Sequence, residues 1–534
     1  MLNNPGLSLS IFGGLLLVLF VARHVSQAIT HRRRARRLGC APAPLQSTGF
    51  PLGLPKVLEM LRADEGHRFP QYLQEENQGI KRKFGRNTQT VESSVLGQRR
   101  FMTTDPVNVR AILATQFKEF GLGKPRNDCL ALLQGYGVFS SDGEQWEHSR
   151  AMLRPQFARE QIDDLSLQAK HSEQMMQAID ASVDIKTGWS QPIDIQQIFF
   201  RFTMDSSTEF LFGTSLDSQL GPLNKSSAAY DIDFDEAAFV EVFDASLDHM
   251  TRGLRLGAFY KLAHTKEAKR VCAVVQGSVD KYVQAALDRR ARAESKPGEK
   301  RRYILADALV EETKDPVEIR NQLLNVLIAG RDTTASLLGW LFLLLARQSE
   351  EYKRLRAETH QTFGPYEDPR NLTHTGLRSC TLLQHCLNEA LRLFPLVPIN
   401  LRKCLVPFTT LPRGGGPLGQ DPIYVRADDD VFYTTVNMHR DVAFWGVDAH
   451  DFRPARWQTV KPGWQFLPFN GGPRICLGQQ FAINQASFVM VRLLQRFDDV
   501  IGVDLPAPGE ELHHLTVTDA CATGVKVKLR RAQG

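Results

Sequence analysis

The fold of this chain is decided by one stretch near its C-terminal end, Phe466-Leu-Pro-Phe-Asn-Gly-Gly-Pro-Arg-Ile-Cys-Leu-Gly-Gln-Gln-Phe481. Two glycines and a proline at 471–473 interrupt regular structure and let the backbone pass close to a flat object. A helical apolar pattern resumes over 477–494, so Cys476 is predicted just ahead of a helix N-terminus. The amides and the dipole of a helix start stabilise a thiolate, which is the form of cysteine that ligates a metal. The stretch therefore predicts a cysteine-ligated metal site.

The sequence motif around this cysteine is typical of one family. Phe469-x-x-Gly472-x-Arg474-x-Cys476-x-Gly478 resembles the cysteine-ligand loop of the cytochrome P450 superfamily in every defining position. A lone cysteine is commonly a small core hydrophobe, whereas a motif of five defined positions that includes this one favours the ligand interpretation. The resemblance implies that Cys476 is the axial ligand of haem b. Thiolate ligation favours cleavage of the O–O bond, and Arg474 adds a fixed positive charge to the loop.

Composition describes one large catalytic unit. The chain has 534 residues, of which 43% are hydrophobic and 23% charged, and no linker-like segment divides it after the first sixty. We therefore expect a single catalytic domain over 51–534. The 65 Lys and Arg residues against 59 Asp and Glu leave a net charge of +6, which does not indicate a nucleic-acid partner.

The N-terminal segment resembles a membrane anchor. The residues from Leu7 to Ala22 are apolar or small, and the stretch from Pro5 to Val25 has about the length of a spanning helix. A cleaved signal peptide and a mitochondrial presequence are the alternatives, but the apolar core precedes the basic run His31–Arg37 instead of following it. We predict a membrane anchor over 1–30 and a basic, proline-containing hinge over 31–50.

The basic run also sets the expected orientation. Positive residues flanking a membrane helix stay in the cytosol, so the catalytic body would face the cytosol from the endoplasmic reticulum membrane on a single-pass anchor. The eight cysteines show no paired or zinc-type spacing, as expected for a reducing compartment.

The part of the chain before the central region is expected to contain both helices and strands. The pattern predicts short helices over 51–64 and 67–78, strands within 80–96, and a helix over 105–117. A glycine-rich, irregular segment is expected from there to 142, and long segments of this kind are often functional.

Trp146 and Arg150 share one helix face, because they are four residues apart. An arginine lying over a tryptophan ring would be an ordinary cation–π contact. In the P450 superfamily a similar pair reaches a haem propionate, a charge that needs a donor in a buried site. The resemblance therefore implies a cofactor-binding role for both residues.

A long central helix carries the second diagnostic feature. Asp315-Pro316 is a typical helix start, and the helical pattern continues to about 346, apolar nearly all round. Its middle reads Ala329-Gly-Arg-Asp-Thr-Thr334. Thr333 could simply bond to a carbonyl one turn back. The hexapeptide also resembles the oxygen-activating stretch of the haem-thiolate monooxygenases, which implies that Thr333 holds water and oxygen while Asp332 relays protons.

Four further charged residues are expected to support the haem site. Glu389 and Arg392 are three apart in apolar sequence, and Arg456 resembles the third member of the family's structural triad. We interpret these three as a scaffold behind the haem loop. Arg402 lies ten residues after Arg392, where family members place another propionate contact.

The resemblance covers nearly the whole chain and implies a fold and a reaction. The fold would be mainly α with small β-sheets, a triangular helical wedge with the central helix over haem. An NADPH-cytochrome P450 reductase would supply electrons, and one oxygen atom would enter a C–H bond of a hydrophobic substrate. Cofactors are thus haem b and, through the reductase, NADPH; the partners are the reductase and membrane lipid.

The substrate is left open between classes. The spellings Leu327–Ala335, Pro398–Asn400 and Thr410–Pro417 resemble the fungal hydroxylases of alkanes and fatty acids. This implies terminal or near-terminal hydroxylation of a long chain. A tailoring oxygenase of secondary metabolism, acting on a polyketide or terpenoid, is the alternative. A haem-thiolate isomerase or dehydratase without a reductase is a third class, and the intact Asp332-Thr333 pair speaks against it.

Overall fold

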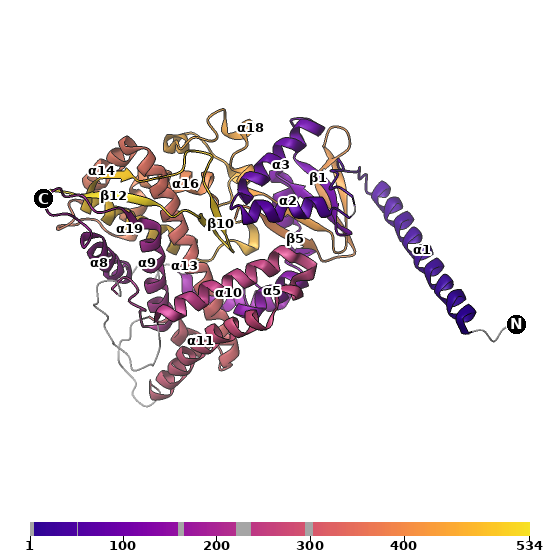
Figure 1. Ribbon diagram of the computed structural model, residues 1–534, viewed down its shortest axis with the longest axis horizontal. Coiled ribbons are helices and arrows are strands. Elements are labelled where there is room, and N and C mark those ends of the chain that lie inside the picture. The colour runs from indigo at the N-terminus through magenta and orange to yellow at the C-terminus, as the bar shows by residue number, and fades with distance from the viewer. Residues whose placement is uncertain (1–4, 51, 159–164, 221–235, 294–302, 534) are drawn as a thin grey trace.

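The computed structural model describes residues 5–50, 52–158, 165–220, 236–293 and 303–533. Helices provide most of the body, which has a triangular outline with α13 passing through its middle (Figure 1). The elements up to this helix are α1 (Pro5–Arg37), α2 (Leu54–Glu65), α3 (Phe69–Phe84), β1 (Thr90–Val95), β2 (Gln98–Thr103), α4 (Pro106–Arg110), η1 (Ala111–Thr115), η2 (Phe117–Glu119), β3 (Phe120–Gly121), α5 (Lys124–Gln134), α6 (Gly143–Leu153), η3 (Arg154–Phe157), α8 (Ser166–Asp180), β4 (Ile193–Asp194), α9 (Ile195–Phe212), α10 (Glu236–Leu256), η5 (Gly257–Ala263), α11 (Lys266–Ala293), α12 (Leu305–Glu312) and α13 (Pro316–Arg347).

The remaining elements complete the helical body and the small sheets. They are α14 (Ser349–Phe363), α15 (His374–Ser379), α16 (Thr381–Leu393), β5 (Asn400–Cys404), β6 (Phe408–Gly415), β7 (Asp421–Arg426), β8 (Asp430–Tyr433), α17 (Thr435–Met438), α18 (Val442–Trp445), η6 (Pro454–Gln458), η7 (Gly463–Gln465), η8 (Gly472–Arg474), α19 (Gln479–Arg496), β9 (Phe497–Gly502), β10 (His513–Leu515), β11 (Asp519–Cys521) and β12 (Lys526–Arg531). This mainly helical architecture with small sheets agrees with the predicted fold class.

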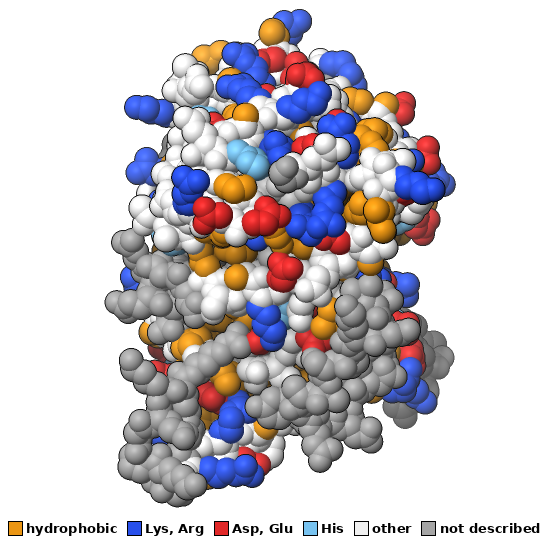
Figure 2. All heavy atoms as spheres, turned by 90° about the vertical axis from the view of Figure 1, so that its left-hand side faces the viewer, with side chains coloured by type: hydrophobic (Ala, Val, Ile, Leu, Met, Phe, Trp, Pro, Cys, Tyr) orange, Lys and Arg blue, Asp and Glu red, His pale blue; other side chains and the backbone are white. Residues whose placement is uncertain are grey.

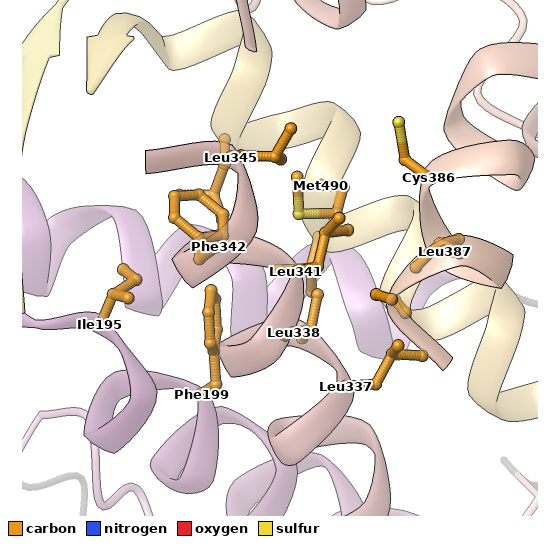
Figure 3. Close-up of a cluster of buried hydrophobic side chains, with 14 of the residues drawn as sticks. Ile195, Phe199, Leu337, Leu338, Leu341, Phe342, Leu345, Cys386, Leu387 and Met490 are labelled. Atoms are coloured by element: carbon orange, nitrogen blue, oxygen red, sulfur yellow. The ribbon is translucent and has the colours of Figure 1, made fainter. Parts of the chain in front are cut away.

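The central helix α13 begins and ends where the sequence predicts. The carboxylate of Asp315 accepts a hydrogen bond from the Val317 amide at 2.9 Å, which caps the first turn. The helix packs among α9, α16 and α19, and Figure 3 shows apolar side chains from these helices meeting around it. The rings of Phe199 and Phe342 lie 5.4 Å apart there. Each such buried side chain stabilises the fold by about 1.5–3 kcal/mol.

A five-stranded sheet holds one of the predicted site residues. Its strand order is β1-β2-β8-β5-β3, and the antiparallel pairing of β5 with β8 places Arg402 opposite Val431. Arg402 is only 2% exposed in this position. The described part of the chain also forms a three-stranded sheet, β4-β12-β9, and the two hairpins β6-β7 and β10-β11. The sheet thus carries a charged side chain into the interior.

The strand prediction over 80–96 is wrong in its first part. Helix α3 continues to Phe84, and the first strand begins at Thr90. Ile80 is buried together with Leu73, seven residues earlier on the same helix face, so tertiary packing extends the helix. Gly85, with a φ of +109°, then ends it.

The irregular segment predicted up to 142 contains a helix. Residues Lys124–Gln134 form α5, and glycines with positive φ precede and follow it. These glycines mark the two ends of a helix instead of breaking one, and Pro125 lies in its first turn, where proline is favoured. This correction matters for the site, because α5 carries one of the cations described below.

Helix α1 runs through the predicted boundary between anchor and hinge. It continues through the basic residues to Arg37 and projects away from the body on the side of β1 (Figure 1). Near its end, His31 Nδ1 lies 3.0 Å from the Tyr424 hydroxyl. The segment that follows is attached to the body, because the Ala41 amide donates to the Pro422 carbonyl at 2.9 Å. The proline-containing segment is therefore bonded to a sheet edge.

One helix of the described chain is long and apolar enough to cross a membrane, and it is α13. Most of α13 is buried, as expected for the core helix of a folded body. The anchor predicted over 1–30 falls partly on residues outside the described ranges, and it stays a prediction.

The face beside α8, α14 and β12 carries charges of both signs. Figure 2 shows Lys and Arg side chains next to Asp and Glu side chains across this face. Several of them form ion pairs, such as Arg530 with Asp498 at 2.7 Å. Exposed pairs of this kind contribute up to about 1 kcal/mol each.

Candidate active site

The loop before α19 is fixed by two glycines whose surroundings leave no room for a side chain. Gly472 has a φ of +69°, and a Cβ there would lie 1.9 Å from the carbonyl oxygen of Leu113. A Cβ on Gly471 would lie 2.8 Å from a neighbouring tryptophan ring. The Cys476 amide donates to the Phe469 carbonyl oxygen at 3.0 Å and closes the loop. Close packing around the two glycines and one backbone hydrogen bond thus set the place of the cysteine.

The side chain of Cys476 lies on an internal surface. It is exposed, yet burial is the largest influence on its thiol and raises the pKa. The thiol is therefore accessible, while protein atoms surround most of it. The Gly478 amide and the charge of Arg150 act in the other direction and lower this pKa. Six other cysteines are buried in the ordinary way: Cys129, Cys272, Cys380, Cys386, Cys404 and Cys521.

Trp146 and Arg150 of α6 have different partners. The buried Trp146 ring lies under the guanidinium group of Arg474, which is 4.5 Å from the ring centroid. Arg150 is 5.7 Å from that ring and donates to the carbonyl oxygen of the residue before Cys476, at 3.0 Å. The positive charge that acts on the thiol therefore comes from Arg150, whereas the sequence analysis assigned it to Arg474.

Three guanidinium groups gather at the edge of the site, from Arg126 on α5, Arg402 on β5 and Arg474. Burial, together with the positive charge of Arg402, lowers the pKa of Arg126 to about 10. Burial also lowers the pKa of Arg474 to about 9, against the opposing charge of Asp142, and the other two arginines add to the effect. The Nε atoms of all three are buried without a partner in the described structure. This excess of positive charge suits a ligand that carries carboxylates.

Asp142 anchors Arg474 and stands directly before α6. Its carboxylate accepts from the Leu122 and Gly123 amides, each at 2.9 Å, and from Arg474 at 2.8 Å. It makes no capping bond to α6, although its position is that of an N-cap. The sequence analysis missed both Asp142 and Arg126. The position of Asp142 at a helix start predicts an N-cap. No feature of the sequence predicts its ion pair with Arg474.

A stripe along α13 borders the same interior. Within 322–345 every side chain is buried except four at the helical spacing i, i+3, i+4 and i+7, namely Val326, Ala329, Gly330 and Thr333. A partly exposed stripe on an otherwise buried helix faces an internal space. Leu477, the neighbour of Cys476, packs in one cluster with Leu327 and Ile328 of α13. The cysteine loop and α13 therefore border the same hydrophobic cluster.

Thr333 and Asp332 have distinct surroundings on this helix. The Thr333 hydroxyl donates to the Ala329 carbonyl oxygen one turn back, at 2.7 Å, which is the purely structural role considered in the sequence analysis. The hydroxyl oxygen can still accept a hydrogen bond. Asp332 is buried, and its Oδ1 atom has no hydrogen-bond partner in the described structure. Burial raises the pKa of Asp332, and the charge of Arg331 opposes this.

Glu389, Arg392 and Arg456 lie in contact in the interior. Arg392 donates to both carboxylate oxygens of Glu389, at 2.8 and 3.0 Å, and Arg456 Nε donates to one of them at 2.8 Å. The Trp457 indole donates to the other at 2.9 Å. Because the carboxylate is surrounded by donors, it is suited to holding the segment before the haem loop in place and not to chemistry.

These residues fit a flat macrocycle that carries carboxylates. Cys476 would supply a thiolate ligand, and Arg126, Arg402 and Arg474 would bind the carboxylates. In the described part of the chain, three or more His, Cys, Asp or Glu side chains nowhere form a metal site of their own. The fold and the site together define the class of haem-thiolate proteins.

Comparisons with known proteins give the family. The cytochrome P450 family model matches residues 53–510. The chain is 40% identical over 501 residues to cytochrome P450 monooxygenase g430 of Fusarium sp, covering 93% of this chain and 86% of that protein. It is 41% identical over 512 residues to cytochrome P450 52A9 of Candida maltosa, covering 94% of each. It is 39% identical over 539 residues to cytochrome P450 monooxygenase himC of Aspergillus japonicus, covering 98% of this chain and 90% of that protein. The chain belongs to the cytochrome P450 family and is a P450 monooxygenase.

Proposed function

We propose that this monooxygenase takes electrons from NADPH-cytochrome P450 reductase and hydroxylates a long aliphatic chain at or near its end. The observation that carries the proposal is the stripe on α13, where Thr333 stands among Val326, Ala329 and Gly330, with Asp332 buried beside it. Such a surface accepts an apolar substrate and offers one hydroxyl and one acid for proton transfer. Oxygen chemistry needs both of these properties.

Different residues of the chain would bind the cofactor and transfer protons. Haem held by a thiolate supplies cleavage of the O–O bond. Cys476 would supply the thiolate ligand of haem, and Arg126, Arg402 and Arg474 would hold its carboxylates. The Thr333 oxygen would accept a hydrogen bond from a water molecule beside α13. Asp332 carries a proton, for which its raised pKa suits it, and passes it toward that water.

The redox partner and the membrane setting follow from the family and the N-terminal segment. The P450 class implies a redox partner, and a reductase bound to the same membrane would meet the cytosolic face of the body. The apolar stretch and the basic run to Arg37 support a single-pass anchor in the endoplasmic reticulum. Protease treatment of intact microsomes tests this topology: the body should be digested without detergent.

The sequences of the segments proposed to line the pocket support an aliphatic substrate. The stretch Leu327–Ala335 resembles that of the fungal alkane and fatty-acid hydroxylases. Val397, Ile399 and Asn400 follow the buried end of α16 but are all at least partly exposed, and we place them at the substrate pocket. Two of these three side chains are apolar, as a hydrocarbon chain requires.

A second candidate is a tailoring oxygenase of secondary metabolism that acts on a polyketide or terpenoid. The observation that favours it is the similarity to P450 monooxygenases from filamentous fungi, such as those of Fusarium sp and Aspergillus japonicus. An isomerase or dehydratase would not need the Asp332-Thr333 pair, because it cleaves no dioxygen. Turnover with NADPH and reductase, compared with peroxide alone, separates these reaction classes.

Two spectral experiments test the proposal. The reduced protein under carbon monoxide should show the red-shifted Soret band of thiolate-ligated haem. Titration of the ferric protein with alkanes, fatty acids and polyketide-like chains should shift the spectrum for the aliphatic series. A shift with polyketide-like chains alone would favour the second candidate, and no response to any acyl chain would remove the lipid assignment.

A further inference from the structure

One cation on α13 lies between two carboxylates. Arg331 Nη1 is 3.3 Å from Asp332 Oδ1. The same guanidinium group makes a two-point contact with Asp244 of α10, through Nη1 to Oδ1 and through Nη2 to Oδ2 at 3.2 Å. The side chains of Arg331 and Asp332 are each 7% exposed, whereas that of Asp244 is 53% exposed. One carboxylate therefore belongs to the interior, and the other reaches solvent.

Aromatic rings confine the guanidinium group. It lies 5.6 Å from the ring centroid of Phe200 on α9 and 5.3 Å from that of Phe243 on α10. A planar cation near two rings gains cation–π energy and loses freedom to turn. Burial lowers the pKa of Arg331, but Asp332 and Asp244 together outweigh this, so the net pKa is raised and the charge is kept.

The two carboxylates compete for this single cation. Because its two-point contact goes to Asp244, the Oδ1 atom of Asp332 keeps no hydrogen-bond partner in the described structure. A buried arginine cannot remain uncompensated without a large cost, so loss of Asp244 would turn both of its terminal nitrogens toward Asp332. Asp332 would then be held as a fully paired carboxylate, the form least suited to giving and taking protons.

The position of α10 decides whether Arg331 pairs mainly with Asp244 or with Asp332. Phe239, Phe243 and Leu247 of α10 pack in one cluster with Leu323, Leu324 and Leu327 of α13. Asp244 follows Phe243 directly, and both side chains contact Arg331, so the ion pair requires that α10 lie beside this part of α13. An outward movement of α10 would separate the ion pair before it disturbed α13 itself.

We propose that Arg331 is a positioning residue which Asp244 holds away from full pairing with Asp332, so that proton passage at Asp332 depends on α10 being seated. The inference rests on the proposed role of Asp332 and adds control by a second helix. With α10 seated, oxygen reduction leads to product. With α10 lifted, Arg331 pairs with Asp332, and electrons are lost to peroxide or water.

The first test is Asp244→Asn in the full-length holoenzyme with reductase. We expect product formed per NADPH to fall by about fivefold or more, the lower range for coupling between sites, while NADPH oxidation persists. The solvent deuterium effect on product formation should rise. Asp248→Asn changes an exposed carboxylate one turn further along α10 and should leave both quantities unchanged. In the resting protein, hydrogen exchange of α10 amides should be faster in Asp244→Asn than in Asp248→Asn.

A double variant distinguishes competition from simple support. Arg331→Gln removes the cation that would capture Asp332, so Arg331→Gln combined with Asp244→Asn should couple better than Asp244→Asn alone. A double variant that is less coupled than either single variant, or an Asp244→Asn enzyme with parental coupling and α10 exchange, overturns the inference. Asp332→Asn separates the two proposals: full coupling in that variant would reject the role of Asp332 itself. Uncoupling there, with Asp244→Asn unaffected, would reject only the control by α10.

Discussion

The loop around Cys476 and the middle of α13 are built in different ways. The loop is fixed over a few residues, by a glycine that admits no Cβ and by the hydrogen bond from the Cys476 amide to the Phe469 carbonyl. The α13 site depends on an ion pair between Arg331 and Asp244, which are 87 residues apart and lie on different helices. The comparison teaches that a site built from backbone geometry is apparent in a local motif. A site built from charges on separate helices becomes apparent only in the folded structure.

The largest expected effect is on the loop side, from Cys476→Ala. Without the thiolate no residue of the loop can serve as the axial ligand, so the reduced protein should lose the red-shifted Soret band under carbon monoxide completely. The measurement is the reduced carbon monoxide difference spectrum, normalised to protein. A parental band in this variant would contradict the assignment of Cys476 and, with it, the whole site.

Gly472→Ala should give the next largest effect, and it tests whether backbone approach fixes the loop. The new Cβ would meet the Leu113 carbonyl at 1.9 Å at a positive φ, so we expect a loss of about 2–4 kcal/mol in stability together with poor haem retention. Gly463→Ala is the matched control, since Gly463 also has a positive φ but a Cβ there meets nothing within 4 Å. Urea unfolding and haem content measure both variants. Equal effects at the two glycines would contradict the steric argument.

The same contrast explains how far the sequence predicts this structure. The bounds of α13 follow from the Asp315-Pro316 start and an apolar run, and the place of Cys476 follows from a motif. Both depend on neighbours in the chain. The fold class was also predictable, because sequence motifs of the family occur along most of the chain.

The parts that could not be predicted depend on contacts between distant residues. Arg126 was hidden in a segment expected to be irregular, because the glycines flanking α5 look like breaks when their partners are unknown. The charge near the thiol comes from Arg150, since the Arg474 side chain turns away to Asp142. Side-chain direction of this kind depends on which carboxylate is nearby in space, and no spacing rule gives that.

On the α13 side, Thr333→Ala should lower product per NADPH by roughly a hundredfold, the lower end of the range for a lost proton-transfer group. NADPH oxidation should continue, since the cysteine loop is untouched. Product and consumed NADPH are measured together with the proposed substrate class. Thr333→Ser keeps the hydroxyl and should restore most of the coupling. If the serine variant were as uncoupled as the alanine variant, the effect would come from helix packing and not from the hydroxyl.

The smallest effect is expected from Asp332→Asn, measured as stability against pH. Burial raises the pKa of Asp332 above the ordinary range for an aspartate, so just above that range the folded state binds more protons than the unfolded state. The free energy of unfolding of the parent therefore falls as the pH rises through the folded pKa, and asparagine, which resembles the neutral acid, removes this loss. The variant should gain about 1 kcal/mol or less relative to the parent at neutral pH, and less at acidic pH. Urea midpoints between pH 5 and 8 measure the difference. A gain that grows toward acidic pH would mean that the ion pair with Arg331 dominates over burial, and α13 would then hold Asp332 as firmly as the loop holds Cys476.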